Sequence, residues 1–162
     1  MQDNISHIQH LTWEDIDVAC RCIYLKMKKD NYKPEAIVGL LRGGVIPARI
    51  FCDYFDVTLD FFAIDIKLYN GIGKRNEKPK IREFEEDLIR GKKILICDDI
   101  LDSGKTMEAI LEHLKGEDIT TATLYCKETA KIKPNYYAEI SGENTWIVYP
   151  WEEEEFKKET SK

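Results

Sequence analysis

The sequence predicts an α/β fold, with a mainly parallel twisted sheet flanked by helices on both faces. Short apolar runs alternate with segments of helical periodicity, which is typical of strands joined by helical crossovers. The runs Ala36–Leu41 and Ile94–Cys97 are continuously apolar, as in strands covered on both faces. A glycine-containing break follows each run, at the edge of the sheet where ligands of such folds bind.

The first helix and strand have clear local signals. Thr12, with Asp15 three residues later, predicts a helix start. Apolar residues then recur at helical spacing, and this helix is expected to end within residues 28–31. The strand Ala36–Leu41 follows and stops at Arg42-Gly43-Gly44.

The next segments change character twice. Pro47 suits the first turn of a helix that runs to about Tyr54. Residues 58–69 are β-branched and aromatic, which predicts a strand. Residues 70–80 hold two glycines, a proline and five charged residues without apolar periodicity, which predicts a mobile loop.

The second half repeats the alternation. Gly91-Lys92-Lys93 introduces the strand Ile94–Cys97, which Asp98 and Asp99 are expected to close. An amphipathic helix begins after Gly104, with Met107, Ile110, Leu111 and Leu114 on one face. Further strands are predicted at Ile119–Cys126, Tyr136–Ile140 and Thr145–Tyr149, and the charged tail Glu152–Lys162 is expected to be solvated or helical.

Composition excludes several classes of protein. The 162 residues suit one domain, with 43% hydrophobic and 33% charged residues. A net charge of −6 disfavours nucleic-acid binding, and no apolar run is long enough to span a membrane. The N-terminus lacks signal-peptide character, so a cytoplasmic location is expected. The five cysteines lack metal-site or framework spacing, and we expect free thiols and no zinc site.

The segment Asp98–Thr106 carries the most specific chemistry. The turn Asp102-Ser103-Gly104-Lys105-Thr106 places backbone N–H groups and hydroxyls at a helix N-terminus, which suits a phosphate. Asp98 and Asp99 would repel a phosphate, but they can accept hydrogen bonds from hydroxyls. Phosphate on one side and hydroxyls on the other describe a ribose 5-phosphate group.

Two other interpretations of this segment fit less well. Gly104-Lys105-Thr106 is like the end of a Walker A loop, but that loop needs glycine where Asp99 stands. In a purely structural interpretation the acids are helix caps. This would explain Asp102 but not Asp98 and Asp99 at the end of a strand.

Arg42-Gly43-Gly44 is a second candidate anion loop. Glycine lets backbone N–H groups approach a ligand closely, and arginine pairs with phosphate oxygens. Glycine pairs after strands are usually only turns, so the motif counts chiefly in combination. Two anion loops and an acid pair fit a ribose that carries phosphates at both ends.

These motifs resemble those of the type I phosphoribosyltransferase family. Its signature is an apolar strand, two acids, two spacers and Asp-Thr/Ser-Gly-x-Thr, which Ile94–Thr106 matches with serine at the variable position. Leu41–Gly44 resembles the family's pyrophosphate loop, which often holds a cis peptide. Asn70–Lys80 resembles its flexible active-site loop, with Tyr69 and Arg75 as implied pyrophosphate contacts. The resemblance implies a core at about residues 10–130 and a small hood at about 127–155, within a single domain of residues 1–162.

The C-terminal part resembles the purine branch of this family. Leu124–Lys127 and Thr145–Glu152 look like the corresponding segments of xanthine-guanine and hypoxanthine-guanine phosphoribosyltransferases. The resemblance implies that Lys127 donates to a purine O6, that Trp146 stacks on the base and that backbone groups of Ile147 contact its 2-position edge. Taken alone, Lys127 is also compatible with a surface lysine and Trp146 with a core tryptophan.

The resemblance also implies substrates and roles. The substrates would be 5-phosphoribosyl-1-pyrophosphate (PRPP), with Mg²⁺ as cofactor, and a 6-oxopurine. Asp98 and Asp99 would hold the ribose hydroxyls directly or with the metal, and Glu152 is a weaker metal candidate. The turn from Asp102 through Ser103, Gly104, Lys105 and Thr106 would hold the 5′-phosphate. Arg42 and Gly43 would bind pyrophosphate, and Asp102 and Arg42 would be the catalytic residues.

Two alternatives remain open at this point. A regulator of the same fold would bind PRPP without chemistry, but Lys127 and Trp146 would then be unnecessary. Another acceptor base, such as uracil, orotate or adenine, fits these two residues less well. The resemblance implies a homodimer or homotetramer, and the aromatics Tyr54, Phe55, Phe61 and Phe62 would serve either an interface or the core.

Overall fold

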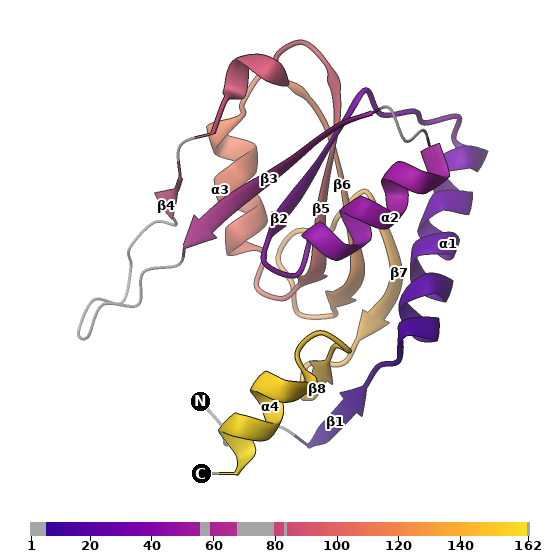
Figure 1. Ribbon diagram of the computed structural model, residues 1–162, viewed down its shortest axis with the longest axis vertical. Coiled ribbons are helices and arrows are strands. Elements are labelled where there is room, and N and C mark those ends of the chain that lie inside the picture. Colours follow the sequence, from indigo (N-terminus) through magenta and orange to yellow (C-terminus); the bar gives the residue numbers. More distant parts are fainter. Residues whose placement is uncertain (1–5, 56–58, 68–79, 83, 162) are drawn as a thin grey trace.

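The structure is a computed structural model that describes residues 6–55, 59–67, 80–82 and 84–161. Its main sheet has six strands in the order β4-β3-β2-β5-β6-β7, and a separate pair joins β1 to β8 (Figure 1). Every pairing is parallel except that of β4 with β3. The predicted α/β class with a mainly parallel sheet is confirmed.

The elements follow the predicted order closely. The first half comprises β1 (His7–His10), α1 (Trp13–Lys29), β2 (Ala36–Leu41), α2 (Val45–Phe55), β3 (Asp60–Lys67) and β4 (Lys80–Ile81). After a 3-10 turn at Glu86–Leu88, the second half comprises β5 (Lys93–Leu101), α3 (Lys105–His113), β6 (Asp118–Lys127), β7 (Tyr136–Ser141), β8 (Thr145–Val148) and α4 (Glu153–Thr160). The predicted loop at 70–80 lies outside the described residues, apart from Lys80, which belongs to β4 rather than to a loop.

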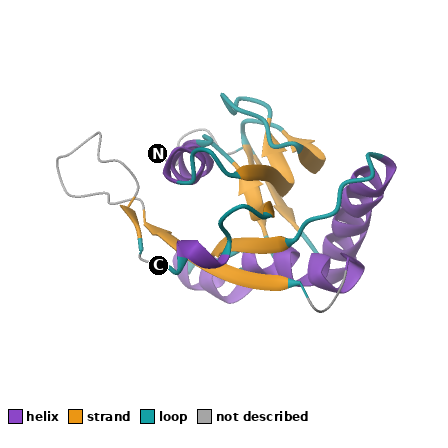
Figure 2. Ribbon diagram, turned by 90° about the horizontal axis from the view of Figure 1, so that it is seen from above, coloured by secondary structure: helices purple, strands orange, loops and turns teal. Residues whose placement is uncertain are grey.

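The helices cover both faces of the sheet, as Figures 1 and 2 show. On one face α1 and α2 bury residues such as Ile23 and Phe51 against Leu95 of β5. On the other face α3 buries Met107 and Ile110 against Ile96. The start of α1 is a capping box, in which Thr12 and Asp15 exchange hydrogen bonds as predicted.

The central strand β5 is longer than predicted. Its pairing with β2 stops at Cys97, but its pairing with β6 continues through Asp98 and Ile100 to Leu101. The expectation that Asp98 and Asp99 close the strand is therefore wrong. They lie within it, because β6 extends far enough to satisfy the backbone of β5 on one side.

The two-stranded sheet and the last helix form a small layer at the carboxyl ends of the main strands (Figure 1). We call β1, β8, α4 and the residues that join β8 to α4 the hood. The strand β1 was not predicted, because four residues that alternate little in polarity become a strand only by pairing with β8, more than 130 positions away. The tail is helical over Glu153–Thr160, one of the two expected states.

Other expectations concern single residues. Tyr54 and Phe55 pack on the core beneath α1 and α2, and Phe62 packs on the α3 side, whereas Phe61 remains 38% exposed. All five cysteines are free thiols. Within the described part of the chain, no helix combines the length and apolar character needed to cross a bilayer.

Candidate active site

The turn between β5 and α3 leaves a helix N-terminus open. Gly104 is the N-cap of α3 with φ of 85°, a left-handed conformation that favours glycine. Among the described residues no side chain caps this helix, so the expectation from a purely structural interpretation, that Asp102 is a cap, is not met. Within that part of the chain the first-turn N–H groups of α3 have no side-chain acceptor, and they can bind an anion.

The two predicted anion loops meet in space. A Cβ atom at Gly43 would overlap the carboxylate of Asp99, so this carboxylate lies directly on the backbone of the first loop. A Cβ at Gly44 would lie 2.8 Å from the Cα of Asp98. The peptide bond between Leu41 and Arg42 is cis, the feature implied for a pyrophosphate loop. Glycine is required here because the loop and the acid pair are in contact.

The surroundings of Asp98 and Asp99 disfavour the charged forms of their carboxyl groups. Burial and the neighbouring Asp99 carboxylate raise the pKa of Asp98 well above its ordinary value, and burial raises the pKa of Asp99. Asp98 accepts a hydrogen bond from the Asp99 N–H at 3.0 Å, and Asp99 accepts one from the Ile100 N–H at 2.8 Å. These bonds offset only part of the desolvation, so the pair favours hydroxyl donors or a cation as partners.

One cavity joins the acid motif to the hood. It has a volume of about 460 Å³ and lies between the end of β5 and the strand β8. The core supplies Asp99 and Asp102, and the hood supplies Trp146 and Ile147. Its walls are completed by Ile100, Lys127, Glu143, Asn144, Thr145, Tyr149 and Glu152.

Lys127 connects the core to the hood from the end of β6. Its side chain is buried, and its Nζ donates to the carbonyl oxygens of Gly142, at 2.9 Å, and of Thr145. Longer contacts of 3.4–3.5 Å join Nζ to the Glu143 carbonyl and the Ser141 hydroxyl. The lysine is therefore not a surface residue. It positions the loop before β8, its remaining N–H makes only the longer contacts, and the residue lines the cavity.

The aromatic residues of the hood have distinct environments. Trp146 is 49% exposed and lines the cavity, so it is not a core tryptophan, whereas Ile147 beside it is buried. Tyr149 is almost fully buried, stacks on Trp151 and donates its hydroxyl to the Asp99 carbonyl at 3.0 Å. The sequence does not predict this link between hood and acid motif, because Tyr149 gives no local signal of its distant partner.

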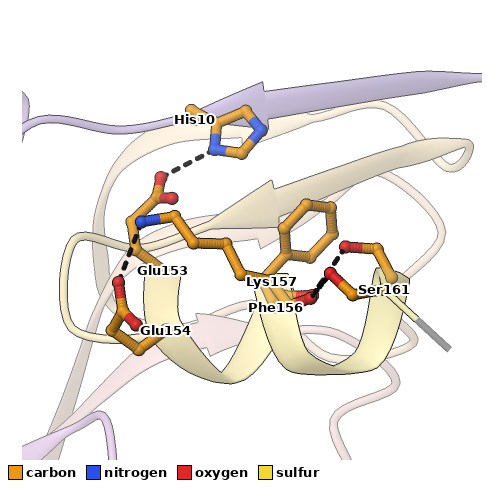
Figure 3. A network of polar contacts seen from close by, with 7 residues as sticks. His10, Glu153, Glu154, Phe156, Lys157 and Ser161 are labelled. Carbon is orange, nitrogen blue, oxygen red and sulfur yellow. Dashed lines mark hydrogen bonds and ion pairs between the residues drawn. The ribbon is translucent and has the colours of Figure 1, made fainter.

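The C-terminal helix reaches the first anion loop. Arg42 donates to both carboxylate oxygens of Glu155 on α4, at 3.1 and 3.2 Å. Figure 3 shows how α4 is held: His10 of β1 contacts Glu153 at 2.7 Å, and its ring meets Phe156 edge-on. Glu152, at the start of α4, lines the cavity, and burial and Asp99 raise its pKa. The sequence predicts a charged tail but not the ion pair between Arg42 and Glu155.

The described residues thus bring most of the predicted site together. Arg42 and Gly43 follow β2, Lys127 ends β6, and the acid pair and the turn through Thr106 span the end of β5 and the start of α3. These strand ends and β8 lie at the same end of the sheet (Figure 1), where Gly43 touches Asp99 and one cavity joins Asp99 to Lys127 and Trp146. Lys105 is exposed at the first position of α3. Tyr69 and Arg75 lie outside the described residues.

An open helix N-terminus, a glycine loop and a half-buried acid pair lie together at the carboxyl edge of a parallel sheet, an arrangement that suits a phosphorylated sugar. Comparison with known proteins gives the family. The family model described as "Phosphoribosyl transferase domain" matches residues 11–155, and the chain belongs to this family. The protein is therefore a pentosyltransferase.

Relatives and solved structures agree with this assignment. A xanthine-guanine phosphoribosyltransferase of Cereibacter sphaeroides is 29% identical over 160 residues, covering 94% of this chain and 92% of that protein. A purine phosphoribosyltransferase structure from Pyrococcus horikoshii has a TM-score of 0.77 and 34% identity, covering 89% of this chain and 93% of that one. A xanthine-guanine-hypoxanthine phosphoribosyltransferase from Helicobacter pylori has a TM-score of 0.79 and 25% identity, covering 96% and 100%.

Proposed function

We propose that this enzyme transfers the 5-phosphoribosyl group of PRPP to a 6-oxopurine, giving a nucleoside 5′-monophosphate and pyrophosphate. The observation that carries the proposal is the single cavity lined by Asp99 and Asp102 from the core motif and by Lys127 and Trp146 at its other end. The names of the relatives, which are purine phosphoribosyltransferases, support the same substrate class.

The core half of the cavity suits PRPP. Asp98 and Asp99 accept hydrogen bonds from the ribose hydroxyls, which relieves the desolvation that raises their pKa values. The 5′-phosphate binds at the N-terminus of α3, through backbone N–H groups of residues 102–106 and the hydroxyls of Ser103 and Thr106. Lys105 adds positive charge at the same helix end.

Pyrophosphate leaves at the loop of Arg42 and Gly43. The glycine backbone and the guanidinium stabilise the negative charge that develops as the bond between C1′ and the pyrophosphate oxygen breaks. The guanidinium of Arg42 is hydrogen-bonded to Glu155, and pyrophosphate competes with that carboxylate for it. Tyr69 and Arg75 remain proposed additional contacts.

The residues present fit Mg²⁺. Mg²⁺ takes one or two carboxylates and completes its shell with substrate oxygens and water. Asp98 and Asp99 supply such carboxylates, Glu152 faces the same cavity, and among the described residues no three acid, histidine or cysteine side chains cluster as a full protein cage. When bound, the ion would neutralise charge on the departing pyrophosphate.

The hood half suits the purine. The exposed face of Trp146 offers a stacking surface, and backbone groups of Ile147 lie at the cavity wall for the 2-position edge. The weakly engaged N–H of Lys127 donates to O6 and meets a like donor in the 6-amino group of adenine. A purine nitrogen attacks C1′ and forms the new bond, and Asp102 accepts the proton released from N7.

The same proposal includes the organisation of the chain. Residues of about 10–130 hold PRPP and those of about 127–155 hold the base, within one domain. We expect a cytoplasmic enzyme that works as a homodimer or homotetramer.

The test is pyrophosphate release from PRPP and Mg²⁺ with hypoxanthine, guanine, xanthine and adenine supplied separately. We expect release with one or more 6-oxopurines and at least about 100-fold less with adenine, because the lysine donor meets a donor there. Release with adenine alone would overturn the assignment of a 6-oxopurine as the acceptor base. PRPP binding by calorimetry without release for any base would place the chain among PRPP-binding regulators.

A further inference from the structure

The outward face of α1 carries an apolar patch that no other described element covers. Ile16, Ile23 and Met27 of this helix are fully buried against the sheet, whereas Val18 is 60% and Leu25 is 55% exposed. Along the helix, the outward residues recur at spacings of four and three positions, which places them on one face. This face comprises Glu14, Val18, Arg21, Leu25 and Lys29.

The residues on this face are arranged symmetrically about its midpoint, with opposite charges at the two ends. The acidic Glu14 stands at one end, the basic Lys29 at the other, and Val18 and Leu25 lie between them. Glu14 and Lys29 lie equally far along the helix from the midpoint between residues 21 and 22, and so do Val18 and Leu25. In an antiparallel helix pair, a two-fold axis between Arg21 and Cys22 therefore places both pairs opposite each other.

We propose that this face of α1 is an interface with a second copy of the chain, formed by antiparallel packing of the two α1 helices. Glu14 of each copy then lies opposite Lys29 of the other, about 11 Å on either side of the axis at 1.5 Å rise per residue. Val18 packs on Leu25 twice. A two-fold interface is self-complementary in this manner, and homodimers are the commonest oligomers.

The two-fold axis brings two like charges close together at the centre of the face. Two Arg21 side chains approach each other near the axis, but each is already paired with Asp17 of its own helix at 2.7 Å. This pairing lowers the repulsion between the two guanidinium groups. Cys22, the least buried of the five cysteines, lies beside the axis.

The size of the interface predicts a reversible dimer. A helix of 17 residues is about 25 Å long, and a pair of such helices buries less than a standard interface. The edge strand β7, whose Ile140 is 48% exposed, runs beside α1 (Figure 1). A membrane surface fits less well, because Glu14 places negative charge on the same face. The inference does not depend on the proposed activity.

The charge pairs give a direct test by sedimentation velocity over a wide protein concentration range. Glu14→Lys and Lys29→Glu each convert both symmetric pairs into repulsions, and we expect each to weaken the association by about tenfold or more. The double variant restores the opposite pairing and should return to within about threefold of the unsubstituted chain. The matched controls Glu112→Lys and Lys115→Glu, on and beside α3, should leave the association unchanged.

Cross-linking gives a second readout. Under mild oxidation we expect a Cys22–Cys22 disulfide between copies, which Cys22→Ser abolishes and Val18→Asp strongly reduces. Thermal unfolding of each variant shows that the exposed substitutions leave the fold intact. A chain that stays monomeric throughout, or an oligomer that both charge reversals and Val18→Asp leave unchanged, would overturn the proposal. If a second interface makes a tetramer, the same variants should halve the number of subunits.

Discussion

The two halves of the cavity are built in different ways. The core half comes from consecutive residues, since Asp98 to Thr106 run from a buried strand directly into a helix. The hood half depends on contacts between separate segments, because Lys127 of β6 donates to the Thr145 carbonyl and Tyr149 donates to the Asp99 carbonyl. A local motif is therefore expected to supply the reaction chemistry, and a tertiary assembly is expected to supply the choice of base.

The largest effect is expected in the core half. Asp102→Ala should lower kcat by about 100- to 1,000-fold, because it removes the proposed acceptor of the N7 proton. Asp102 is exposed and does not cap α3, so the melting temperature should change little. Asp118→Ala, at the start of β6 on the opposite edge, is the matched control. Unchanged turnover would remove Asp102 from the reaction.

A change at the junction of the halves should affect activity and stability together. Lys127→Met leaves the carbonyls of Gly142 and Thr145 without their donor, at a cost of about 2 kcal/mol and about 4–8 °C in melting temperature. Turnover of guanine should fall by about 100-fold. Lys131→Met, an exposed lysine four residues later, should change neither quantity. A variant as stable as the unsubstituted enzyme would show that Lys127 does not hold the hood.

Within the hood half, the stacking of Trp146 on the base should determine how tightly the base binds. Trp146→Ala should raise the KM for the base by about tenfold or more, because aromatic stacking on a base contributes about 1–3 kcal/mol. The KM for PRPP should stay within about twofold. Trp146→Phe retains a flat face and should recover most of the base affinity. Equal losses for both substrates would contradict the division between halves.

The acid pair should make stability depend on pH. Burial raises the pKa of Asp98, so above the ordinary value of 3.8 the folded state retains a proton that the unfolded chain releases. The free energy of unfolding therefore falls as pH rises from about 4 through the raised pKa, and it levels off above it. Asp98→Asn, measured by thermal unfolding at about pH 4.5 and 7.5, should weaken this fall. The variant should gain about 2–4 °C over the unsubstituted chain at the higher pH.

The smallest effect is expected where the hood touches the pyrophosphate loop. The side chain of Arg42 is 83% exposed, and exposed ion pairs contribute at most about 1 kcal/mol. Glu155→Gln should therefore change the KM for PRPP by less than about threefold, most visibly at low ionic strength. A change of tenfold or more would show that α4 belongs to the catalytic machinery rather than supporting it.

The same division explains what could be predicted from the sequence. The capping box at Thr12, the strand Ala36–Leu41 and the helix after Gly104 depend on neighbouring residues, and all were predicted. The extension of β5 past Cys97 and the strand β1 depend on partner strands far along the chain, and both were missed.

The site shows the same contrast. The cis peptide and the apposition of Gly43 to Asp99 agree with the predicted pair of loops. The carbonyl partners of Lys127 and the hydrogen bond from Tyr149 to Asp99 were not predictable, because neither leaves a pattern in the local sequence.

The most direct test of this account is the ratio of kcat/KM for guanine to that for adenine, measured in Asp102→Asn and Lys127→Gln. If chemistry resides in the core half and base choice in the hood half, Asp102→Asn should lower both values and preserve the ratio. Lys127→Gln should reduce the ratio by about tenfold or more, because a glutamine can also accept from a 6-amino group. A preserved ratio in Lys127→Gln, or a collapsed ratio in Asp102→Asn, would contradict the account.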